Sequence, residues 1–274
     1  MIHALIILIL SANAGVVIVD NVWFYGNDHK MRILTTGDMV EIVEHINETV
    51  RVEYDSATGE LNRNVLIDLN EEIAEDEQFV FARGYFDEGE YVKSARLLDI
   101  FTKYFDDSKY LSEALYYLGQ SYEALALKGQ SDSLPGFSFN DKIEQAYYNG
   151  DVYKILVNAF PDSPFASKAE YRLINIFRLG HLPWLDSVEL IQQELTMWDE
   201  FCSKYQNTDE YPLGLSEKGH LNRVLFEITN ETNYKEEAIV IFTEITTKYP
   251  NTVHAAYSNV HLFEIERGEK IYKY

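Results

Sequence analysis

A short phrase of one aromatic residue followed by turn-forming residues occurs four times in this chain. The copies read Phe105-Asp106-Asp107-Ser108, Phe160-Pro161-Asp162-Ser163, Tyr205-Gln206-Asn207-Thr208 and Tyr249-Pro250-Asn251-Thr252. Anchored on positions 106, 161, 206 and 250, they lie 55, 45 and 44 residues apart, and each follows an amphipathic stretch. Spacings of this size are typical of arrays built from pairs of helices. The phrase therefore predicts a helical repeat, a kind of fold that usually binds other molecules.

The helix before each phrase carries large apolar residues at fixed places. The residues eight and five positions before the anchors are Leu98 and Phe101, Tyr153 and Leu156, Trp198 and Phe201, and Phe242 and Ile245. Packing against a neighbouring helical pair requires such residues on one face, so we expect all eight to be buried. Twelve positions before the anchor stand Ser94 and Ala238, but Asn149 and Glu194 in the middle copies. The middle pairs are therefore expected to be longer and looser.

Helical periodicity begins near Asn70 and continues almost to the end of the chain. The predicted helices span about 71–88, 90–105, 110–128, 140–160, 165–179, 184–205, 216–229, 233–249 and 252–267. Within the third, the spacing Leu115-x-x-Leu118-Gly119-x-x-Tyr122 resembles the first helix of a tetratricopeptide repeat. The resemblance covers about 75–267, and the divergent middle copies are similar to the repeats of bacterial envelope assembly proteins. It implies a mainly α fold over 70–274, a solenoid of four hairpins plus a closing helix.

The region before the helices shows strand-like patterns instead. Apolar β-formers occur at 16–19, 22–25, 39–43, 50–54 and 65–67, with turns expected at 26–28 and 57–59. Five short strands predict a small barrel over 15–69. The aromatic strand Trp23-Phe24-Tyr25 and the segment Leu34-x-x-Gly37-Asp38-x-Val40-x-Ile42 resemble a bacterial SH3-like domain. The resemblance implies an all-β SH3-like barrel, and binding to cell-wall glycan is a role of many relatives.

The first fourteen residues have the pattern of a secretory leader. An apolar run from Ala4 to Leu10 is followed by small residues that include Ala12 and Ala14, as a processing site requires. We expect cleavage after Ala14 and a secreted or periplasmic protein. The run is too short for a permanent transmembrane helix, although a buried first strand remains an alternative.

The charge balance limits the partners. With 23 basic and 45 acidic residues, the formal net charge is -22. Such a field repels phosphate backbones, so we expect no nucleic-acid partner, and it attracts a partner with a basic segment. An acidic surface that merely keeps the array soluble is the alternative reading. Hydrophobic residues make up 46% of the chain, which is normal for a folded protein.

The inner face of such an array is lined by its first helices, which gives candidate partner-binding residues. The candidates are Tyr116, Gln120, Glu123, Tyr171, Asn175 and Arg178. Tyrosine combines a rigid ring with a polar tip, which suits recognition, and the chain has 20 of them. Most tyrosines in such helices can equally be half-buried packing residues. The resulting prediction is a scaffold that holds a protein or peptide on the concave face.

Catalytic and metal-binding motifs are missing from the sequence. It contains no phosphate-binding glycine loop, no Gly-x-Ser-x-Gly, no His-Glu-x-x-His and no Cys-x-x-Cys. His254 and His261 stand two helical turns apart, about 10 Å, so they cannot share one metal ion. We therefore expect no enzyme activity, cofactor or metal. Two alternatives remain open: a glycan or cell-wall binder acting through the SH3-like region, and a carbohydrate-active enzyme with a carboxylate pair in the groove.

Overall fold

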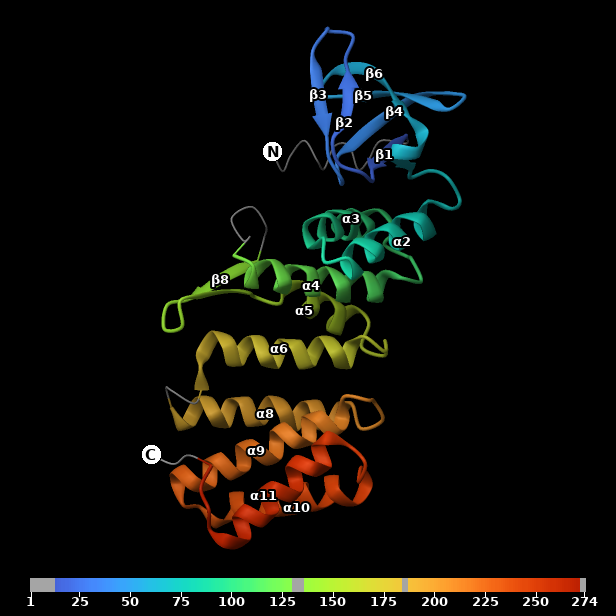
Figure 1. The fold of residues 1–274 in the computed structure, drawn as a ribbon. Coiled ribbons are helices and arrows are strands. Elements are labelled where there is room, and N and C mark those ends of the chain that lie inside the picture. The colour runs from blue at the N-terminus through green and yellow to red at the C-terminus, as the bar shows by residue number, and fades with distance from the viewer. Residues whose placement is uncertain (1–12, 130–135, 184–186, 272–274) are drawn as a thin grey trace. The chain divides into compact units, whose positions relative to one another are not determined.

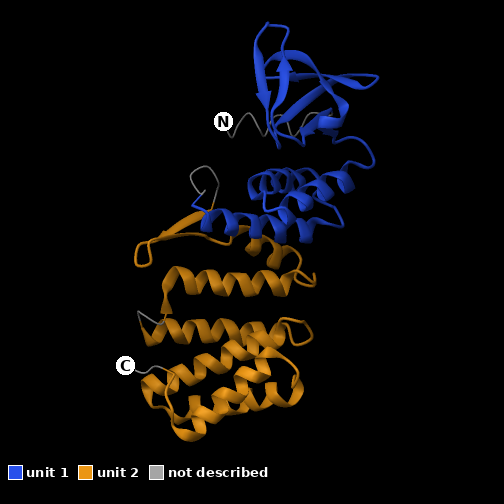
Figure 2. Ribbon diagram, viewed as in Figure 1, with its two compact units in different colours: residues 1–134 blue, residues 135–274 orange. Residues whose placement is uncertain are grey.

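A computed structural model describes residues 13–129, 136–183 and 187–271. The chain forms two compact units, residues 1–134 and 135–274 (Figure 2). Among the described residues, the first unit contains seven strands and three α-helices, and the second contains a two-stranded hairpin and six α-helices. Figure 1 shows their arrangement along the chain. The change from strand to helix falls between Asp68 and Ala74, close to the expected domain boundary at 69–70. The first three helices nevertheless belong to the same compact unit as the strands.

The strands of the first unit form one open antiparallel sheet and one separate hairpin. They are β1 (Ala14–Val17), β2 (Val22–Tyr25), β3 (Met31–Leu34), β4 (Met39–Ile46), β5 (Thr49–Tyr54), β6 (Ala57–Asn62) and β7 (Leu66–Asp68), with a 3₁₀ turn at Arg63–Val65. The main sheet has the order β6-β5-β4-β1-β7, and β2 pairs with β3. Within residues 13–129 the edge strands β6 and β7 do not pair, so the expected barrel is not closed there.

Two of these strands, β3 and β6, were not expected from the sequence. The segment 57–59, predicted as a turn, is the first half of β6. The turn lies two residues earlier, at Asp55 and Ser56, which both have positive φ, of 49° and 58°. Two such residues form the tight hairpin connection whose twist matches the flanking strands. The prediction placed the turn at Gly59 because glycine is the usual signal for positive φ.

The hydrophobic core of the sheet region follows from strand alternation. Val50 and Val52 of β5 are buried, as are Phe24 of β2 and Leu34 of β3. On β2 and β3 the alternate residues point away from this core and are exposed. Each strand therefore contributes one apolar face to a shared core, as successive side chains on opposite faces require.

Hydrogen bonds and ion pairs fasten the sheet to the helices of the first unit. The Tyr85 hydroxyl donates to the carbonyl of Ile18 at 2.6 Å. The Lys93 ammonium lies 3.1 Å from the Asp20 carboxylate. These contacts connect residues of the loop after β1 with helix residues more than sixty positions away in the chain. They explain why the first helices form one compact unit with the sheet.

The predicted leader lies largely outside the described residues. Only Asn13 and Ala14 of it are described, and both take part in the sheet. The amide of Ile42 donates to the carbonyl of Asn13 at 2.6 Å, and the amide of Leu69 donates to the carbonyl of Ala14 at 2.9 Å. Cleavage after Ala14 would therefore remove two of the hydrogen bonds at the start of β1.

The described residues contain nine α-helices, so the molecule is mainly helical. They are α2 (Ala74–Asp87), α3 (Tyr91–Tyr104), α4 (Leu111–Leu127), α5 (Asp151–Ala159), α6 (Ala166–His181), α8 (Val188–Lys204), α9 (Tyr211–Thr229), α10 (Thr232–Lys248) and α11 (Val253–Arg267). Within each unit, helices adjacent in sequence pack on one another. None of the described helices is long and apolar enough to cross a membrane.

The structure corrects the helix expected at 140–160. A hairpin of β8 (Phe137–Asn140) and β9 (Gln145–Tyr148) occupies its first part, and α5 begins only at Asp151. Aromatic residues alternate with small or polar ones in β8, a period typical of strands. Gly150, with φ of 81°, then turns the chain into α5. The middle pair thus has a short second helix preceded by a hairpin, in place of a longer helix.

The four copies of the repeated phrase have the same backbone structure. Each aromatic residue ends a helix with φ between −132° and −113° and ψ between 35° and 63°. Its amide donates to the carbonyl of the residue four positions earlier, and its own carbonyl accepts from the Ser or Thr amide three positions later. The donor–acceptor distances of this second bond are 3.2, 3.0, 3.2 and 3.1 Å for Ser108, Ser163, Thr208 and Thr252. The phrase is therefore one helix-ending turn, repeated four times.

All eight apolar positions predicted before these turns are buried. The side chains of Leu98, Phe101, Tyr153, Leu156, Trp198, Phe201, Phe242 and Ile245 have a relative exposure of 0%. Close approach of helices accompanies them, because a Cβ on Gly214 would lie 2.6 Å from the Phe201 ring and one on Gly219 would lie 2.7 Å from the Phe242 ring. Only glycine at these two positions of α9 lets the aromatic rings of α8 and α10 pack there.

Candidate functional site

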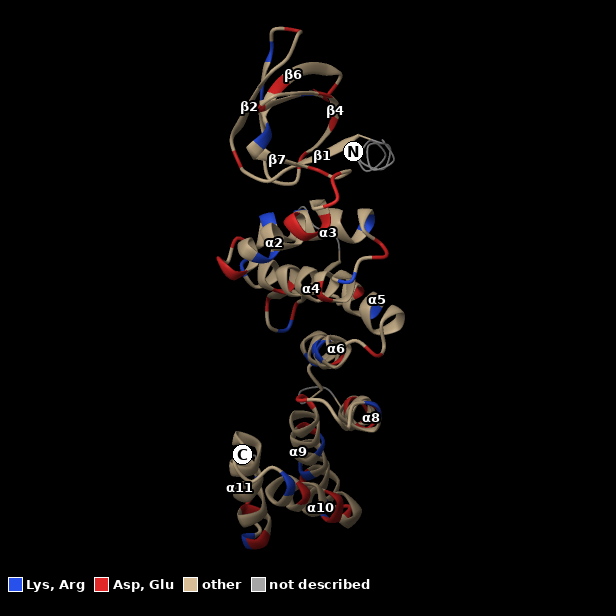
Figure 3. Ribbon diagram, turned by 90° about the vertical axis from the view of Figure 1, so that its right-hand side faces the viewer, with Lys and Arg blue, Asp and Glu red and all other residues tan. Residues whose placement is uncertain are grey.

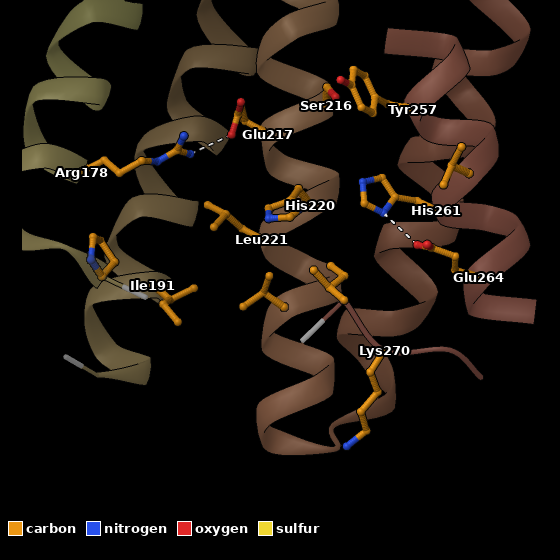
Figure 4. A pocket seen from close by; sticks show the side chains of 14 residues that line it. Arg178, Ile191, Ser216, Glu217, His220, Leu221, Tyr257, His261, Glu264 and Lys270 are labelled. Atoms are coloured by element: carbon orange, nitrogen blue, oxygen red, sulfur yellow. Dashed lines mark hydrogen bonds and ion pairs between the residues drawn. The ribbon is translucent and has the colours of Figure 1, made fainter. Parts of the chain in front are cut away.

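The candidate site is a pocket within the second unit, between the helices α6, α9 and α11. Its volume is about 780 Å³, and Ile191 near the start of α8 and the segment after α11 complete its walls. Figure 4 shows the side chains that line it, with Glu217 and His220 on one helix facing Tyr257 and His261 on another. A second cavity, of about 700 Å³, lies in the first unit beside the ion pair of His45 with Asp68.

The repeat spacing explains which side chains reach the pocket of the second unit. Adding 45 and then 44 residues to the candidates Tyr171, Asn175 and Arg178 gives the equivalent positions on the next two first helices. These positions are Ser216, His220 and Arg223 on α9, and Val260, Glu264 and Arg267 on α11. Arg178, Ser216, His220, Val260 and Glu264 all line the pocket. Five of these nine equivalent positions therefore border one cavity, whereas Tyr171, Asn175, Arg223 and Arg267 do not line it.

Arg178 is held on one wall by two carboxylates. Its guanidinium donates to Glu194 and also to Glu217, the latter at 2.7 Å. Glu194 is buried and also accepts a hydrogen bond of 3.2 Å from the Trp198 indole. Burial opposes the charge of Arg178, but Glu217 and Glu194 raise its pKa. Two other copies have a small residue, Ser94 or Ala238, at the position of Glu194. The ion pair with Arg178 explains why this copy has a glutamate instead.

Arg223 forms the corresponding cluster one repeat later. It is almost completely buried, and its Nε lies 3.2 Å from Glu227 while one Nη donates to Glu264. The same Nη1 lies 2.7 Å from Nδ1 of His261, and Nη2 donates to the carbonyl of Glu269 at 2.9 Å. The cluster connects α9, α11 and the segment that follows α11.

Glu227 strengthens this connection from the other side of Arg223. Its two carboxylate oxygens accept from the amide of Ile271 at 2.9 and 3.0 Å. The segment that follows α11 is thereby fixed at the pocket, where Lys270 and Ile271 form part of the wall. Hydrogen bonds that involve charged groups are about twice as strong as neutral ones, so we expect this wall to be well ordered.

Two histidines in the pocket have lowered pKa values. Burial lowers the pKa of His220. Burial, together with the neighbouring His220 and the positive charge of Arg223, lowers the pKa of His261 to about 4. The His261 ring stacks on Phe242, with ring centroids 4.7 Å apart and planes 13° apart. Both imidazoles are therefore uncharged at neutral pH, and the His261 ring is fixed in orientation.

The pocket also has an apolar surface and an exposed rim. Ile191, Leu221 and Val224 form apolar parts of its lining. Tyr257 and Val260 line it too, but both are exposed, at 61% and 53%. A site with apolar walls and a few placed polar groups is typical of ligand recognition.

The remaining candidates do not line this pocket. The Tyr171 ring packs against Trp198 at 5.8 Å, and the Asn175 side chain donates to the carbonyl of Tyr171 at 2.9 Å. Tyr116, Gln120 and Glu123 lie on α4 in the first unit and are half-buried there. The structure thus brings one of the six named residues, Arg178, to the pocket. The repeat spacing, applied to the later copies, would also have identified the pocket residues Ser216, His220, Val260 and Glu264.

Other reactive groups lie elsewhere or are engaged. Cys202 is buried beside Gly214, and burial raises the pKa of its thiol to about 12, so it stays protonated. The described ranges contain no group of three or more His, Cys, Asp or Glu side chains placed to hold a metal ion. Acidic residues occur in both units, in helices as well as in the sheet region (Figure 3).

No protein-family model matches the chain, and no curated protein sequence is significantly similar to it.

Proposed function

We propose that this protein is a non-enzymatic scaffold or adaptor that binds a segment of another protein in the pocket of its second unit. The helices would form a tetratricopeptide-like solenoid, preceded by an SH3-like sheet domain. Four identical helix-ending turns and eight buried positions at matching places support the repeat. A repeat of this kind exposes its first helices on the concave face and uses them for binding.

One observation carries the proposal: two pairs of residues 44 positions apart, on α9 and α11, line the same pocket. Ser216 and His220 stand at the same repeat positions on α9 as Val260 and Glu264 on α11, and all four side chains line it. Core side chains would be chosen for packing, whereas these four differ in size, polarity and charge. Varied side chains around a common cavity favour recognition of a specific partner.

The environment of the charged groups favours binding over catalysis. The pocket carboxylates Glu217 and Glu264 each accept from a guanidinium group, of Arg178 and Arg223 respectively. Each arginine faces more than one carboxylate, so each cluster carries excess negative charge. Together with the net charge of -22, this favours a partner that brings a basic side chain to the pocket.

The proposed location is the cell envelope or the exterior, after removal of a leader near Ala14. Ala12 and Ala14 provide the small side chains that processing requires. Mass spectrometry of the protein isolated from its native cells tests this location. A chain that begins at Gly15 supports it, and an intact Met1 in most molecules contradicts it.

Photochemical cross-linking tests the binding site. A photoreactive phenylalanine analogue is placed at Tyr257 on the pocket rim or, as a control, at Val240 on α10, which is 60% exposed and lies outside the pocket lining. Both proteins are produced in the native host and irradiated, and the products are identified by mass spectrometry. We expect a defined protein adduct from position 257 that position 240 does not form. No adduct from 257, or the same adducts from both positions, contradicts the proposal.

A second candidate function, glycan or cell-wall binding by the sheet domain, is favoured by exposed aromatic residues. Trp23 and Tyr25 on β2 are 60% and 65% exposed on one face, beside Met31 and Ile33 of β3. Flat rings of this kind can stack on sugars, and large exposed apolar patches mark interaction sites. Cosedimentation with purified cell-wall glycan tests this function, with Trp23→Ala expected to abolish binding and Val43→Ala, another exposed strand residue, to preserve it.

A further inference from the structure

His261 lines the pocket, and the buried side chain of Arg223 fixes the protonation state of its imidazole ring. Arg223 Nη1 lies 2.7 Å from His261 Nδ1. A guanidinium group only donates hydrogen bonds and keeps its proton in proteins, so Nδ1 must be the acceptor. The ring is then neutral and carries its hydrogen on Nε2.

Burial, His220 and Arg223 favour this state and outweigh Glu264, the one neighbouring group whose charge favours protonation. Arg223 and His220 approach from α9, Glu264 lies on the same helix with an oxygen 3.9 Å from Nδ1, and Phe242 of α10 stacks on the ring. Protonation of Nδ1 would direct an N–H at the Arg223 guanidinium. The pKa of about 4 for His261 agrees with this geometry.

The second ring nitrogen faces the pocket. Figure 4 shows the imidazole of His261 between α9 and α11, with Nε2 directed toward the side of Ser216 and Tyr257. No described residue accepts a hydrogen bond from Nε2. Leu221, Val224 and Val260 provide apolar surface in the same cavity. The N–H of His261 Nε2 is thus a fixed donor beside apolar walls. A ligand that matches the pocket has a hydrogen-bond acceptor next to an apolar group.

The charge of the pocket selects between possible acceptors. The charged residues of the lining are two carboxylates, Glu217 and Glu264, and two cations, Arg178 and Lys270, and Arg178 is already bound by Glu194 and Glu217. The lining therefore has no excess positive charge that would select a carboxylate at Nε2, and a neutral amide carbonyl accepts the same hydrogen bond. Every residue of a peptide offers such a carbonyl next to a side chain.

We propose that His261 is a permanently neutral hydrogen-bond donor, positioned by Arg223, and that the pocket recognises a peptide carbonyl next to a branched aliphatic side chain. This inference rests on the proposed binding function and names the chemical group that the pocket reads. His261 would contact the ligand directly, and Arg223 would act as a positioning residue through it.

Nitrogen-15 NMR of the full-length protein tests the fixed state without any ligand. Between pH 5 and 8 we expect an unprotonated Nδ1 and a protonated Nε2 for His261, with little titration. His254 on the same helix, outside the pocket lining, is the internal comparison. A hydrogen on Nδ1, or titration of His261 near the ordinary histidine pKa of about 6.5, overturns the inference.

The ligand preference is tested with N-acetyl-leucine methylamide as the probe and N-acetyl-leucine, which bears a carboxylate, for comparison. Methyl signals of Leu221 and Val260 should shift with the methylamide and respond more weakly to the carboxylate. His261→Phe keeps an aromatic ring for Phe242 but removes the donor, and it should weaken binding about fivefold, the effect of one hydrogen bond. The matched variant His254→Phe should bind like the parent.

Equal binding by His261→Phe and the parent, no binding of the methylamide, or a preference for the carboxylate overturns the inferred ligand. These results are independent of the cross-linking experiment. An adduct from position 257 together with a titrating His261 would leave the binding function intact and remove only the fixed donor. Absence of an adduct would remove the binding function, whatever the tautomer.

Discussion

The buried face of α3, α5, α8 and α10 differs in how its repeat positions are filled from the face of α4, α6, α9 and α11 that we propose as the inner face. The buried face is apolar at all eight positions. At one inner-face position the residues are Tyr116, Tyr171, Ser216 and Val260, and at the next they are Gln120, Asn175, His220 and Glu264. The eight buried positions pack against neighbouring helices, where a large apolar side chain is favoured, whereas Ser216, His220, Val260 and Glu264 border the pocket. The constant face holds the fold, and we infer that the variable face determines what is bound.

The largest expected effect comes from the constant face. Trp198→Ala should lower the free energy of unfolding by about 3–5 kcal/mol, because it removes a fully buried aromatic ring and leaves Glu194 without its indole partner. Val240→Ala, at an exposed position of α10, should change it by less than about 0.5 kcal/mol. Denaturant unfolding of both variants measures the difference. Equal stabilities would mean that the second-helix face does not hold the fold.

Arg223 and Arg267 occupy equivalent repeat positions, but Arg223 is buried and Arg267 is exposed. Substituting each one shows how much burial contributes to its effect on stability. Arg223→Leu should destabilise the protein by about 3 kcal/mol, because Glu227 and Glu264 would keep their charges without their partner. Arg267→Leu removes the equivalent arginine of α11, which is exposed and pairs with Glu269, and should cost less than about 1 kcal/mol. Chemical denaturation again provides the measurement. Similar losses would show that repeat position alone, and not burial, sets the contribution.

Acidification should weaken the Arg223 cluster through His261. Its pKa is about 4 in the folded protein, below the ordinary value of 6.5, so the unfolded chain binds the proton more readily. The stabilisation is complete above pH 6.5 and is lost as the pH falls toward 4. About 2 kcal/mol should be lost between pH 7 and pH 5.

His261→Phe should remove this part of the pH dependence. Parallel unfolding curves of parent and variant at pH 7 and pH 5 isolate the contribution of the ring. His220 also has a lowered pKa and remains in the variant, so some dependence of the same sign should persist. A parent and a variant with the same slope between these pH values would contradict the assigned environment of His261.

Much of the helical architecture could be predicted from the sequence. Seven of the nine described helices begin and end near the predicted positions. The helix α9 starts five residues earlier than expected, at Tyr211, because Pro212 is well tolerated in a first helical turn. The hairpin β8–β9 was missed because its strands are only four residues long, too short to distinguish from the helical pattern around them.

The pocket was only partly predictable for a different reason. Arg178 follows from the repeat position, and the same spacing gives Ser216 and His220. The contact of Arg223 with His261, however, joins residues 38 positions apart on different helices. Sequence spacing showed that His261 and His254 could not share a metal ion, but the arginine that holds His261 depends on how α9 packs beside α11.

The most direct test asks whether the variable face binds the partner without contributing to stability. It repeats the cross-linking from position 257 in two variants, each with one valine replaced by aspartate. Val260→Asp places a charge in the pocket lining, while Val240→Asp places one at an exposed site on α10. Both substitutions are at exposed positions, so both should leave the free energy of unfolding within about 0.5 kcal/mol of the parent. We predict that the adduct formed from position 257 disappears in Val260→Asp and persists in Val240→Asp. An adduct of undiminished yield in a folded Val260→Asp variant would contradict the assignment of the inner face as the binding surface.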